Sequence, residues 1–374
     1  MATTLLGPLL PLLASRWAMS DASAGALFTA QFVGQLTTTT MSTAITDRLG
    51  AHRMLVGGFA LVAVGVGAIA VLPGSSAWAA VVIYGLGLGC VLPVTNIQVA
   101  ALAQTRAASA LSLVNVSWGV GAMAWPLVVA SLTGLHAAAP TTALAVASVA
   151  MGCAWLAMPQ GDPSSTAVAP LLTAGAPTPP RVVIYGVLIL LYVGSETAIS
   201  GWVAAFARRM GSGAGAWAYA PTAFWSAQTV GRLIAPVLLH RVSEARLLLG
   251  SLLSSVVAVL LLSTVATTVG GVIAASALAG VGVAAVFPLL WAGVSRDVAP
   301  SRPSAVGPLF AAGGVGGALL PWMVGVVSTG YGLSTGLLVP LSGLVLMLGI
   351  GLLATPRLLQ AFDVDGVAGH HRPK

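Results

Sequence analysis

Glu196 is an acidic residue inside a long apolar stretch, 15 residues after Arg181 and 12 before Arg208. An ionised carboxyl group without a partner is costly in such surroundings, so this group must be protonated, paired or in contact with water. It is therefore a natural proton acceptor, because low dielectric favours its neutral form while water or a cation favours its charged form. The structural alternative is a glutamate hydrogen-bonded to a neighbouring helix.

Other polar residues recur at helical spacing around this carboxyl group. Tyr192, Glu196 and Ser200 follow one another every four residues, which aligns them on one face of a helix. A later apolar segment carries a second such face, made of Trp225, Gln228 and Arg232. These residues are predicted to line a polar site.

Arg232 is the one basic residue within an apolar stretch, and the sequence leaves two roles open for it. Arg241 lies only about 13 Å away along a helix axis, so the side chain of Arg232 can reach the nearest polar boundary. Alternatively, Arg232 faces a cavity and pairs with Glu196 or contacts a solute. Gln31 and Gln35 occupy the positions that match Gln228 and Arg232 in an earlier segment.

Amide and aromatic side chains also occur together. Asn115 and Trp118 share a helical stripe with Ala122 and Trp125, and Asn96 follows a proline in the preceding segment. Amides match hydroxyl groups as both donors and acceptors, and aromatic rings cover the apolar face of a sugar. The pattern favours a site for a neutral polyhydroxylated solute, although a lone tryptophan in an apolar helix more often serves packing.

The composition shows that these residues lie in a membrane protein. Only 6% of the residues are charged and 57% are hydrophobic, whereas soluble domains are roughly 25% charged. Apolar runs long enough to cross a bilayer must be helices, because their backbone groups need partners within the segment. Such runs are predicted at 22–46, 53–73, 77–102, 107–134, 139–158, 182–208, 217–239, 245–267, 269–293, 304–328 and 334–355.

The chain repeats itself after about 195 residues. The segments AQFVGQL at 30–36 and GLGLGCVLP at 85–93 return as AQTVGRL at 227–233 and GVGVAAVFP at 280–288. A period this long suits two fused membrane halves. We predict an N-terminal bundle at 1–159, a linker at 160–180, a C-terminal bundle at 181–355 and a loosely ordered tail at 356–374.

The first helix of this plan is incomplete. Residues 2–14 are apolar but would span only about 20 Å as a helix, and aligning the halves places Gly7 near Gly201. We expect a first helix that is cut short, through either a start codon placed too far downstream or a true truncation. A signal peptide is less favoured, because no basic region precedes the apolar run.

The basic residues give an orientation and limit the chemistry. Alternating helices place eleven of them on the side of the 47–53 loop, the linker and the C-terminus, which the positive-inside rule assigns to the cytoplasm. The single lysine, Lys374, excludes a nucleotide-binding P-loop, and no catalytic motif is present. We therefore expect a multi-pass protein of the plasma membrane that is not an enzyme, is monomeric, and binds no cofactor, metal or nucleic acid.

The loop after the first complete span reads DRLGAHRMLVG, at 47–57. It resembles the signature loop of the major facilitator superfamily, with an Asp-Arg pair, a glycine that matches Gly50, and further basic residues. The resemblance implies an all-α fold of two six-helix halves related by a parallel repeat. It also implies that Asp47, Arg48 and Arg53 latch the halves in one state. Alternatively, these charges serve only membrane orientation.

Four further segments resemble the fucose and glucose/mannose proton symporter branch of that superfamily: ALFTAQFVGQL at 26–36, NVSWGVGAMAWP at 115–126, SETAISGWVAAFARR at 195–209 and LFAAGGVGGALLPW at 309–322. The resemblance implies uptake of a sugar or similar polar solute with protons, by alternating access, with Glu196 coupling to the proton. The predicted solute-binding residues are Gln31, Gln35, Asn96, Asn115, Trp118, Tyr192, Ser200, Gln228 and Arg232. The alternatives are proton-driven efflux of an amphipathic compound and, in a different class, a membrane receptor that transports nothing.

Overall fold

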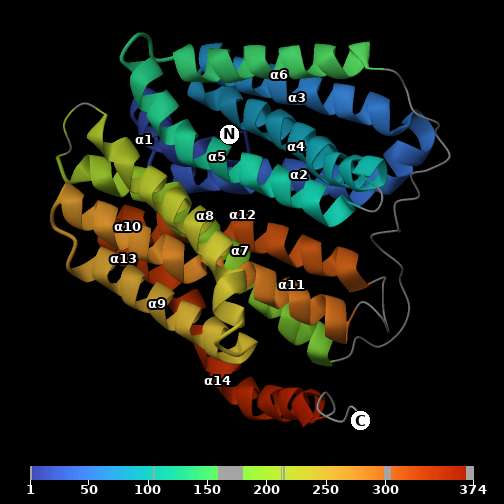
Figure 1. The fold of residues 1–374 in the computed structure, drawn as a ribbon. Helices are drawn as coiled ribbons and strands as arrows, with labels where there is room; N and C mark the ends of the chain where they lie inside the picture. The colour runs from blue at the N-terminus through green and yellow to red at the C-terminus, as the bar shows by residue number, and fades with distance from the viewer. Residues whose placement is uncertain are drawn as a thin grey trace.

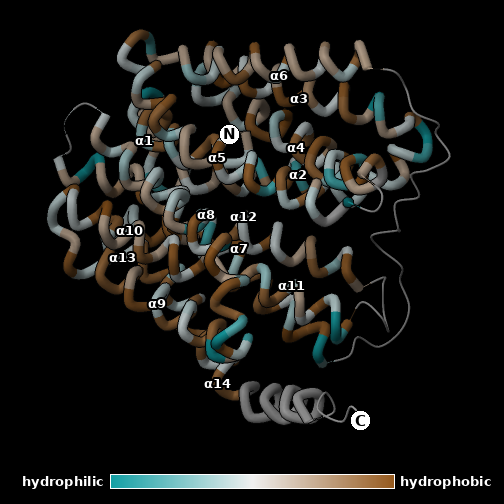
Figure 2. The backbone as a smooth tube through the Cα atoms, viewed as in Figure 1, coloured by the Kyte–Doolittle hydropathy of each residue, from teal (hydrophilic) through white to brown (hydrophobic). Residues whose placement is uncertain are grey.

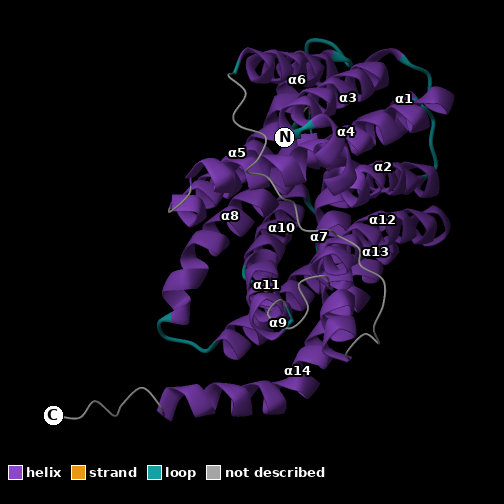
Figure 3. Ribbon diagram, turned by 90° about the vertical axis from the view of Figure 1, so that its right-hand side faces the viewer, coloured by secondary structure: helices purple, strands orange, loops and turns teal. Residues whose placement is uncertain are grey.

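The computed structural model describes residues 2–103, 106–158, 180–211, 213, 215–298 and 305–367, and their regular structure is entirely helical (Figure 3). The predicted linker lies outside the described residues except for residue 180, where a helix begins. Residues 368–374 of the predicted tail also lie outside them. The all-helical prediction is confirmed for the described part of the chain.

The first half of the chain forms the upper bundle in Figure 1. A short 3₁₀ turn (η1, Ala2–Thr4) precedes its helices. These are α1 (Leu6–Arg16), α2 (Asp21–Leu49), α3 (Ala51–Val71), α4 (Gly74–Ala103), α5 (Ala107–Thr133) and α6 (Ala139–Ala157).

The second half forms the lower bundle in Figure 1. Its helices are α7 (Pro180–Arg209), η4 (Ala216–Ala218), α8 (Tyr219–Leu239), α9 (Glu244–Thr264), α10 (Val269–Ala284), α11 (Val286–Asp297), α12 (Val306–Tyr331), α13 (Leu333–Gly336) and α14 (Leu338–Val367). Helices α10 and α11 form one span with a break at Ala285, because Pro288 disturbs the preceding turn. Helix α14 continues from the membrane span into the predicted tail as far as residue 367.

Nine helical segments of the described chain are long and apolar enough to cross a membrane. Helices α2 and α8, which the sequence also predicted as spans, are not among the nine although they have 29 and 21 residues. Both carry the glutamines described above, and α8 also carries Arg232. Their polar residues are tolerated because both helices pack against other helices rather than facing lipid all round.

The first helix is short, as expected from the sequence. Helix α1 has 11 residues, whereas its counterpart α7 has 30. The two helices pack at the glycines that the sequence alignment pairs. A Cβ atom added at Gly7 would lie 2.9 Å from the carbonyl oxygen of Ser200, next to Gly201.

The signature loop is a tight turn between α2 and α3. Gly50 adopts φ +81°, a conformation that residues with side chains rarely adopt. The glycine of the DRLG sequence is therefore required by the backbone. Figure 2 shows this turn as a hydrophilic segment beside largely apolar helices.

Repeated glycines bring the helices of each half into close contact. A Cβ atom at Gly85 of α4 would overlap the carbonyl oxygen of Gln31 on α2. One repeat later, a Cβ atom at Gly280 of α10 would overlap the carbonyl oxygen of Phe224 on α8. The same helix-packing contact thus occurs in both halves of the chain.

The halves meet chiefly where α2 packs against α12, α5 against α8, and α1 against α7. The contacts between α2 and α12 run from Asp21 beside Ser328, at the beginning of α2 and near the end of α12, to Leu36 beside Gly314. For example, Thr29 donates to the carbonyl oxygen of Ala318 at 2.7 Å, and a Cβ at Gly317 would overlap the ring of Phe32. The contact of Asp21 with Ser328 lies away from the 47–53 loop, on the side predicted to face outward.

The glycine contact predicts a selective loss of stability. We expect Gly85→Ala to lower the free energy of unfolding by about 1–3 kcal/mol, because the added methyl group has no room against the α2 backbone. We expect the same direction for Gly280→Ala. The measurement is the thermal unfolding midpoint of the purified protein in detergent.

Gly57→Ala is the matched control, because nothing lies within 4 Å of a Cβ at this position of α3. Alanine is a better helix former than glycine, so this variant should be as stable as the parent or slightly more stable. Equal midpoints for Gly85→Ala and Gly57→Ala would contradict the packing argument.

Candidate functional site

A cavity of about 240 Å³ lies between the two halves. Its walls come from η1, α1, α2, α4 and α5 of the first half and from α7 and α8 of the second. The residues lining it are Thr3, Thr4, Leu6, Gly7, Phe28, Gln31, Phe32, Gln35, Leu92, Trp118, Val193, Glu196, Thr197, Ser200, Gly201 and Trp225.

The carboxyl group of Glu196 at this wall is the acceptor of three donors. The hydroxyl of Tyr192 donates to its Oε1 at 2.7 Å, and the guanidinium of Arg232 lies 3.3 Å from the same oxygen. The amide of Gln228 is the third donor. These contacts satisfy the charged carboxylate inside the protein. This geometry is compatible with Glu196 as a proton acceptor and with Glu196 as a structural residue hydrogen-bonded to a neighbouring helix.

Arg232 turns toward Glu196 instead of extending to the membrane boundary. Its side chain is 28% exposed, and its guanidinium also lies 5.7 Å from the centre of the Trp118 ring. That distance is within the range of a cation–π contact. Because Trp118 is on α5, Arg232 connects the second half to the first.

Trp118 is held from two sides. Its indole nitrogen donates to the hydroxyl of Thr3 at 2.8 Å, and its ring meets the ring of Trp225 edge-on, with centroids 5.2 Å apart. The two tryptophans come from different halves and both line the cavity. They present aromatic surface on either side of the interface.

Gln31 and Gln35 line the opposite wall on α2. No hydrogen bond joins either side-chain amide to another described residue, so both are available to a ligand. Gln228 retains a buried Oε1, and Arg232 a buried Nε, without a partner in the described part of the chain. Gln228 and Arg232 are not among the residues that line the cavity, and they lie behind Glu196. The unused amides that the cavity offers directly are those of Gln31 and Gln35.

Tyr192 and Ser200, which share one face of α7 with Glu196, also lie at or next to the cavity. Ser200 lines the cavity, and its hydroxyl donates to the carbonyl oxygen of Thr197 at 3.4 Å. Tyr192 is fully covered and reaches the cavity only through Glu196. The four-residue spacing thus gathers Tyr192, Glu196 and Ser200 along one side of α7.

The two predicted asparagines are not brought to the cavity. Asn115 is exposed, and its amide donates to the carbonyl oxygen of Leu111 at 3.0 Å within α5. Asn96 is exposed on α4. Neither is among the cavity residues. Trp125, on the same stripe as Asn115, is buried in the core, with its indole nitrogen 3.5 Å from the carbonyl oxygen of Leu5.

The predicted latch residues lie at a different place, around the α2–α3 turn. Asp47, Arg48 and Arg53 are exposed there. No ion pair or hydrogen bond joins their side chains to another described residue. Within the described part of the chain, no polar contact of these three side chains joins the halves in this conformation.

Sequence reasoning missed several residues of the cavity wall. Phe28 and Phe32 belong to the α2 face that carries Gln31 and Gln35, so extending the helical spacing by one turn would have found them. Thr3, Thr4 and Thr197 gave no signal, because short hydroxyl side chains are common in membrane helices. Among the described residues, no group of acidic, histidine and cysteine side chains is arranged to hold a metal.

Comparison with known proteins identifies the fold. The family model described as Major Facilitator Superfamily matches residues 1–321. No curated protein matches the chain in sequence.

Three similar structures cover nearly the whole chain. The nucleoside transporter NupG and a point mutant of it are 15% and 16% identical over 93% of this chain and 94% of theirs, with TM-scores of 0.75 and 0.77. The transporter FucP in the outward conformation is 16% identical over 94% of both chains, with a TM-score of 0.61. The predictions of fold, family and absence of enzymatic function are confirmed. This chain belongs to the major facilitator superfamily and is a membrane transporter of a small solute.

Proposed function

We propose that the protein takes up a sugar or a similar polar solute together with protons, by alternating access of the central cavity to the two sides of the plasma membrane. The carboxyl group of Glu196 binds the coupled proton. The observation that carries this proposal is the position of Glu196 at the wall of the cavity between the halves. One oxygen of its carboxylate accepts hydrogen bonds from Tyr192, Gln228 and Arg232.

Protonation of Glu196 changes the charge at the cavity. The carboxylate and the Arg232 guanidinium together carry no net charge. A proton that binds the carboxylate leaves a neutral acid and an unpaired cation beside the cavity. Arg232 and Gln228 then lose an acceptor and gain capacity to bind a solute hydroxyl or carbonyl group. Solute binding and proton binding at this place thus support each other.

The size and lining of the cavity favour a small, neutral ring compound with hydroxyl groups. Its volume of about 240 Å³ is below the ~300–1,000 Å³ usual for drug-sized ligands. The amides of Gln31 and Gln35 match hydroxyl groups, and the rings of Trp118 and Trp225 match an apolar ring face. A monosaccharide meets these requirements. A nucleoside, the solute named for the structural relative NupG, also combines a sugar with a flat ring.

The protein works as a monomer, with the linker, the 47–53 loop and the C-terminus in the cytoplasm. This orientation rests on the distribution of basic residues. Asp47, Arg48 and Arg53 act as a latch in the state that opens outward. Their exposure and lack of described partners agree with a loop that engages only in the other state.

Replacement of Glu196 tests proton coupling. We expect Glu196→Gln to abolish uphill, proton-driven uptake and to retain solute exchange, because glutamine keeps the hydrogen-bonding shape and cannot take up the proton. The measurement is uptake of labelled monosaccharides and nucleosides into proteoliposomes, with and without an imposed pH gradient.

Glu244→Gln is the control, because Glu244 forms an ion pair with Arg296 at 3.2 Å, away from the cavity lining. Uphill uptake that survives in Glu196→Gln would overturn the role of Glu196. A gradient that drives solute outward instead would support the efflux of an amphipathic compound, and binding without flux would indicate a receptor.

The aromatic wall predicts an effect on affinity. We expect Trp118→Leu to raise the KM for the transported solute roughly tenfold, because the ring contact with the solute and the edge-on contact with Trp225 are lost. Trp322→Leu is the control, since Trp322 on α12 is 40% exposed and outside the cavity lining. An equal change of KM in both variants would show that the effect is general.

The latch predicts an effect on rate instead. We expect Asp47→Asn to slow turnover several-fold with little change in solute affinity, because a latch acts on the exchange between states. Turnover is measured by flux and affinity by direct binding to the purified protein. A large loss of affinity at unchanged turnover would contradict the latch.

A further inference from the structure

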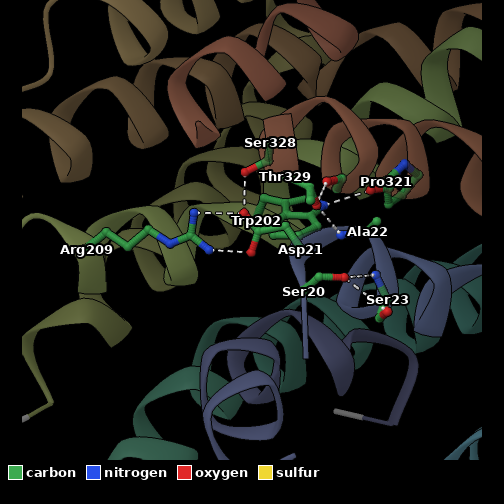
Figure 4. Close-up of polar contacts among 10 residues, drawn as sticks. Ser20, Asp21, Ala22, Ser23, Trp202, Arg209, Pro321, Ser328 and Thr329 are labelled. Atoms are coloured by element: carbon green, nitrogen blue, oxygen red, sulfur yellow. Dashed lines mark hydrogen bonds and ion pairs between the residues drawn. The ribbon is translucent and has the colours of Figure 1, made fainter. Parts of the chain in front are cut away.

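A second polar cluster joins the halves at the end of the interface away from the 47–53 loop (Figure 4). Asp21 is the first residue of α2, Arg209 the last of α7, and Ser328 lies near the end of α12. The Arg209 guanidinium donates to the Asp21 carboxylate through both terminal nitrogens, one of them at 2.9 Å. The hydroxyl of Ser328 donates to the same carboxylate. One side chain of the first half thus holds two helices of the second.

Neighbouring contacts extend this connection along α12. The backbone N–H of Ala22 donates to the hydroxyl of Thr329 at 2.9 Å, which links α2 to α12 next to Asp21. The indole nitrogen of Trp202, on α7, donates to the carbonyl oxygen of Pro321 at 2.9 Å. Figure 4 shows these bonds as one group around the Asp21 carboxylate.

The backbones are also in close contact there. A Cβ atom at Gly325 of α12 would overlap the carbonyl oxygen of Asp21, and one at Gly25 of α2 would lie 2.8 Å from the carbonyl oxygen of Pro321. No side chain or water layer fits between the helices at these points. The polar cluster therefore closes an interface that is already tight.

The charges of the cluster suit their positions. Asp21 lies at the N-terminus of one helix and Arg209 at the C-terminus of another, where the helix dipoles favour a negative and a positive charge. Burial raises the pKa of Asp21, but the hydrogen bonds from Arg209 and Ser328 outweigh it and lower the pKa below its usual value. The carboxylate stays ionised at the pH values where the transporter would work.

The ion pair of Asp21 differs from the others. Four ion pairs occur among the described residues, and three of them join helices or neighbouring residues of the second half. The pair of Asp21 and Arg209 crosses between halves. The side chain of Asp21 is 14% exposed and that of Arg209 is 43% exposed, so the carboxylate is the better protected of the two from solvent.

We propose that Asp21, Arg209 and Ser328 form a clasp that keeps the cavity closed on this side and sets the equilibrium between the two access states. The proposal rests on the alternating access described above. Opening this side requires α2 to separate from α7 and α12, which breaks every bond of the clasp. These bonds add to the close backbone packing in favouring the closed state, because separation of the helices would leave Asp21 and Arg209 with water as their partner.

The test measures access to the cavity with a thiol reporter. Cys90 and Cys153 are first replaced by serine, since both are free thiols. Thr197→Cys then places a thiol at the cavity wall. A membrane-impermeant maleimide is added to sealed vesicles of each orientation, and the labelling rate is followed by mass spectrometry.

We expect Asp21→Asn to raise the labelling rate from the clasp side about tenfold, the change that corresponds to one lost charge-assisted hydrogen bond, and to lower it from the opposite side. Arg209→Gln and Ser328→Ala should act in the same direction, with the smallest effect for Ser328→Ala. Glu244→Gln is the matched control. It breaks an ion pair within one half and should leave both rates unchanged.

Two results would overturn the clasp. One is an unchanged labelling rate in Asp21→Asn and Arg209→Gln. The other is an equal rise in Glu244→Gln, which would indicate general loosening. The double variant Asp21→Arg/Arg209→Asp exchanges the two charges and restores the ion pair. It should therefore label more slowly than Asp21→Arg alone, which separates loss of the ion pair from misfolding of a single variant. Labelling needs neither solute nor pH gradient, so its outcome is independent of the solute and of proton coupling at Glu196.

Discussion

The cost of placing a carboxylate in a low-dielectric interior governs the arrangement around Glu196. The chain meets this cost with Tyr192 from the same helix and with Gln228 and Arg232 from α8. Because α7 and α8 each supply partners, the carboxylate fixes their relative position as well as its own charge. The arginine in turn needs a partner whenever the carboxylate is neutral. A site built in this way joins one acidic and one basic side chain through a single carboxylate oxygen.

The two halves share a scaffold and differ where the chemistry lies. Gly85 and Gly280 make equivalent helix contacts one repeat apart, so close packing belongs to the shared scaffold. Arg232, in contrast, matches Gln35, and the offset of 197 residues places Ala218 opposite Asp21. The charges of Arg232 and of Asp21 are therefore absent from the equivalent positions of the other half. The repeat accounts for the two similar helix bundles. The positions at which the halves differ make the two sides of their interface chemically different.

The sequence was sufficient for the helices and for the α7 stripe, because both depend on local periodicity and on the solvent being lipid. Periodicity identifies a helix face but not the direction in which that face points. Asn115 and Trp118 are three residues apart, yet Trp118 turns to the cavity while Asn115 bonds back to its own helix. The pairing of Asp21 with Arg209 spans 188 residues and depends on how the halves are docked. No local pattern contains that information.

The central site and the clasp are connected by the helices that carry them. Glu196 and Arg209 lie on the same helix, 13 residues or about 20 Å apart. Gln31 and Asp21 both lie on α2, 10 residues or about 15 Å apart. A helix transmits displacement along its axis with little loss, since its backbone bonds are all internal. Any shift of α7 that follows the charge change at Glu196 must therefore move Arg209 relative to Asp21. If the proposals for the cavity and for the clasp both hold, the same two helices carry residues of each, and movement of either helix affects both places.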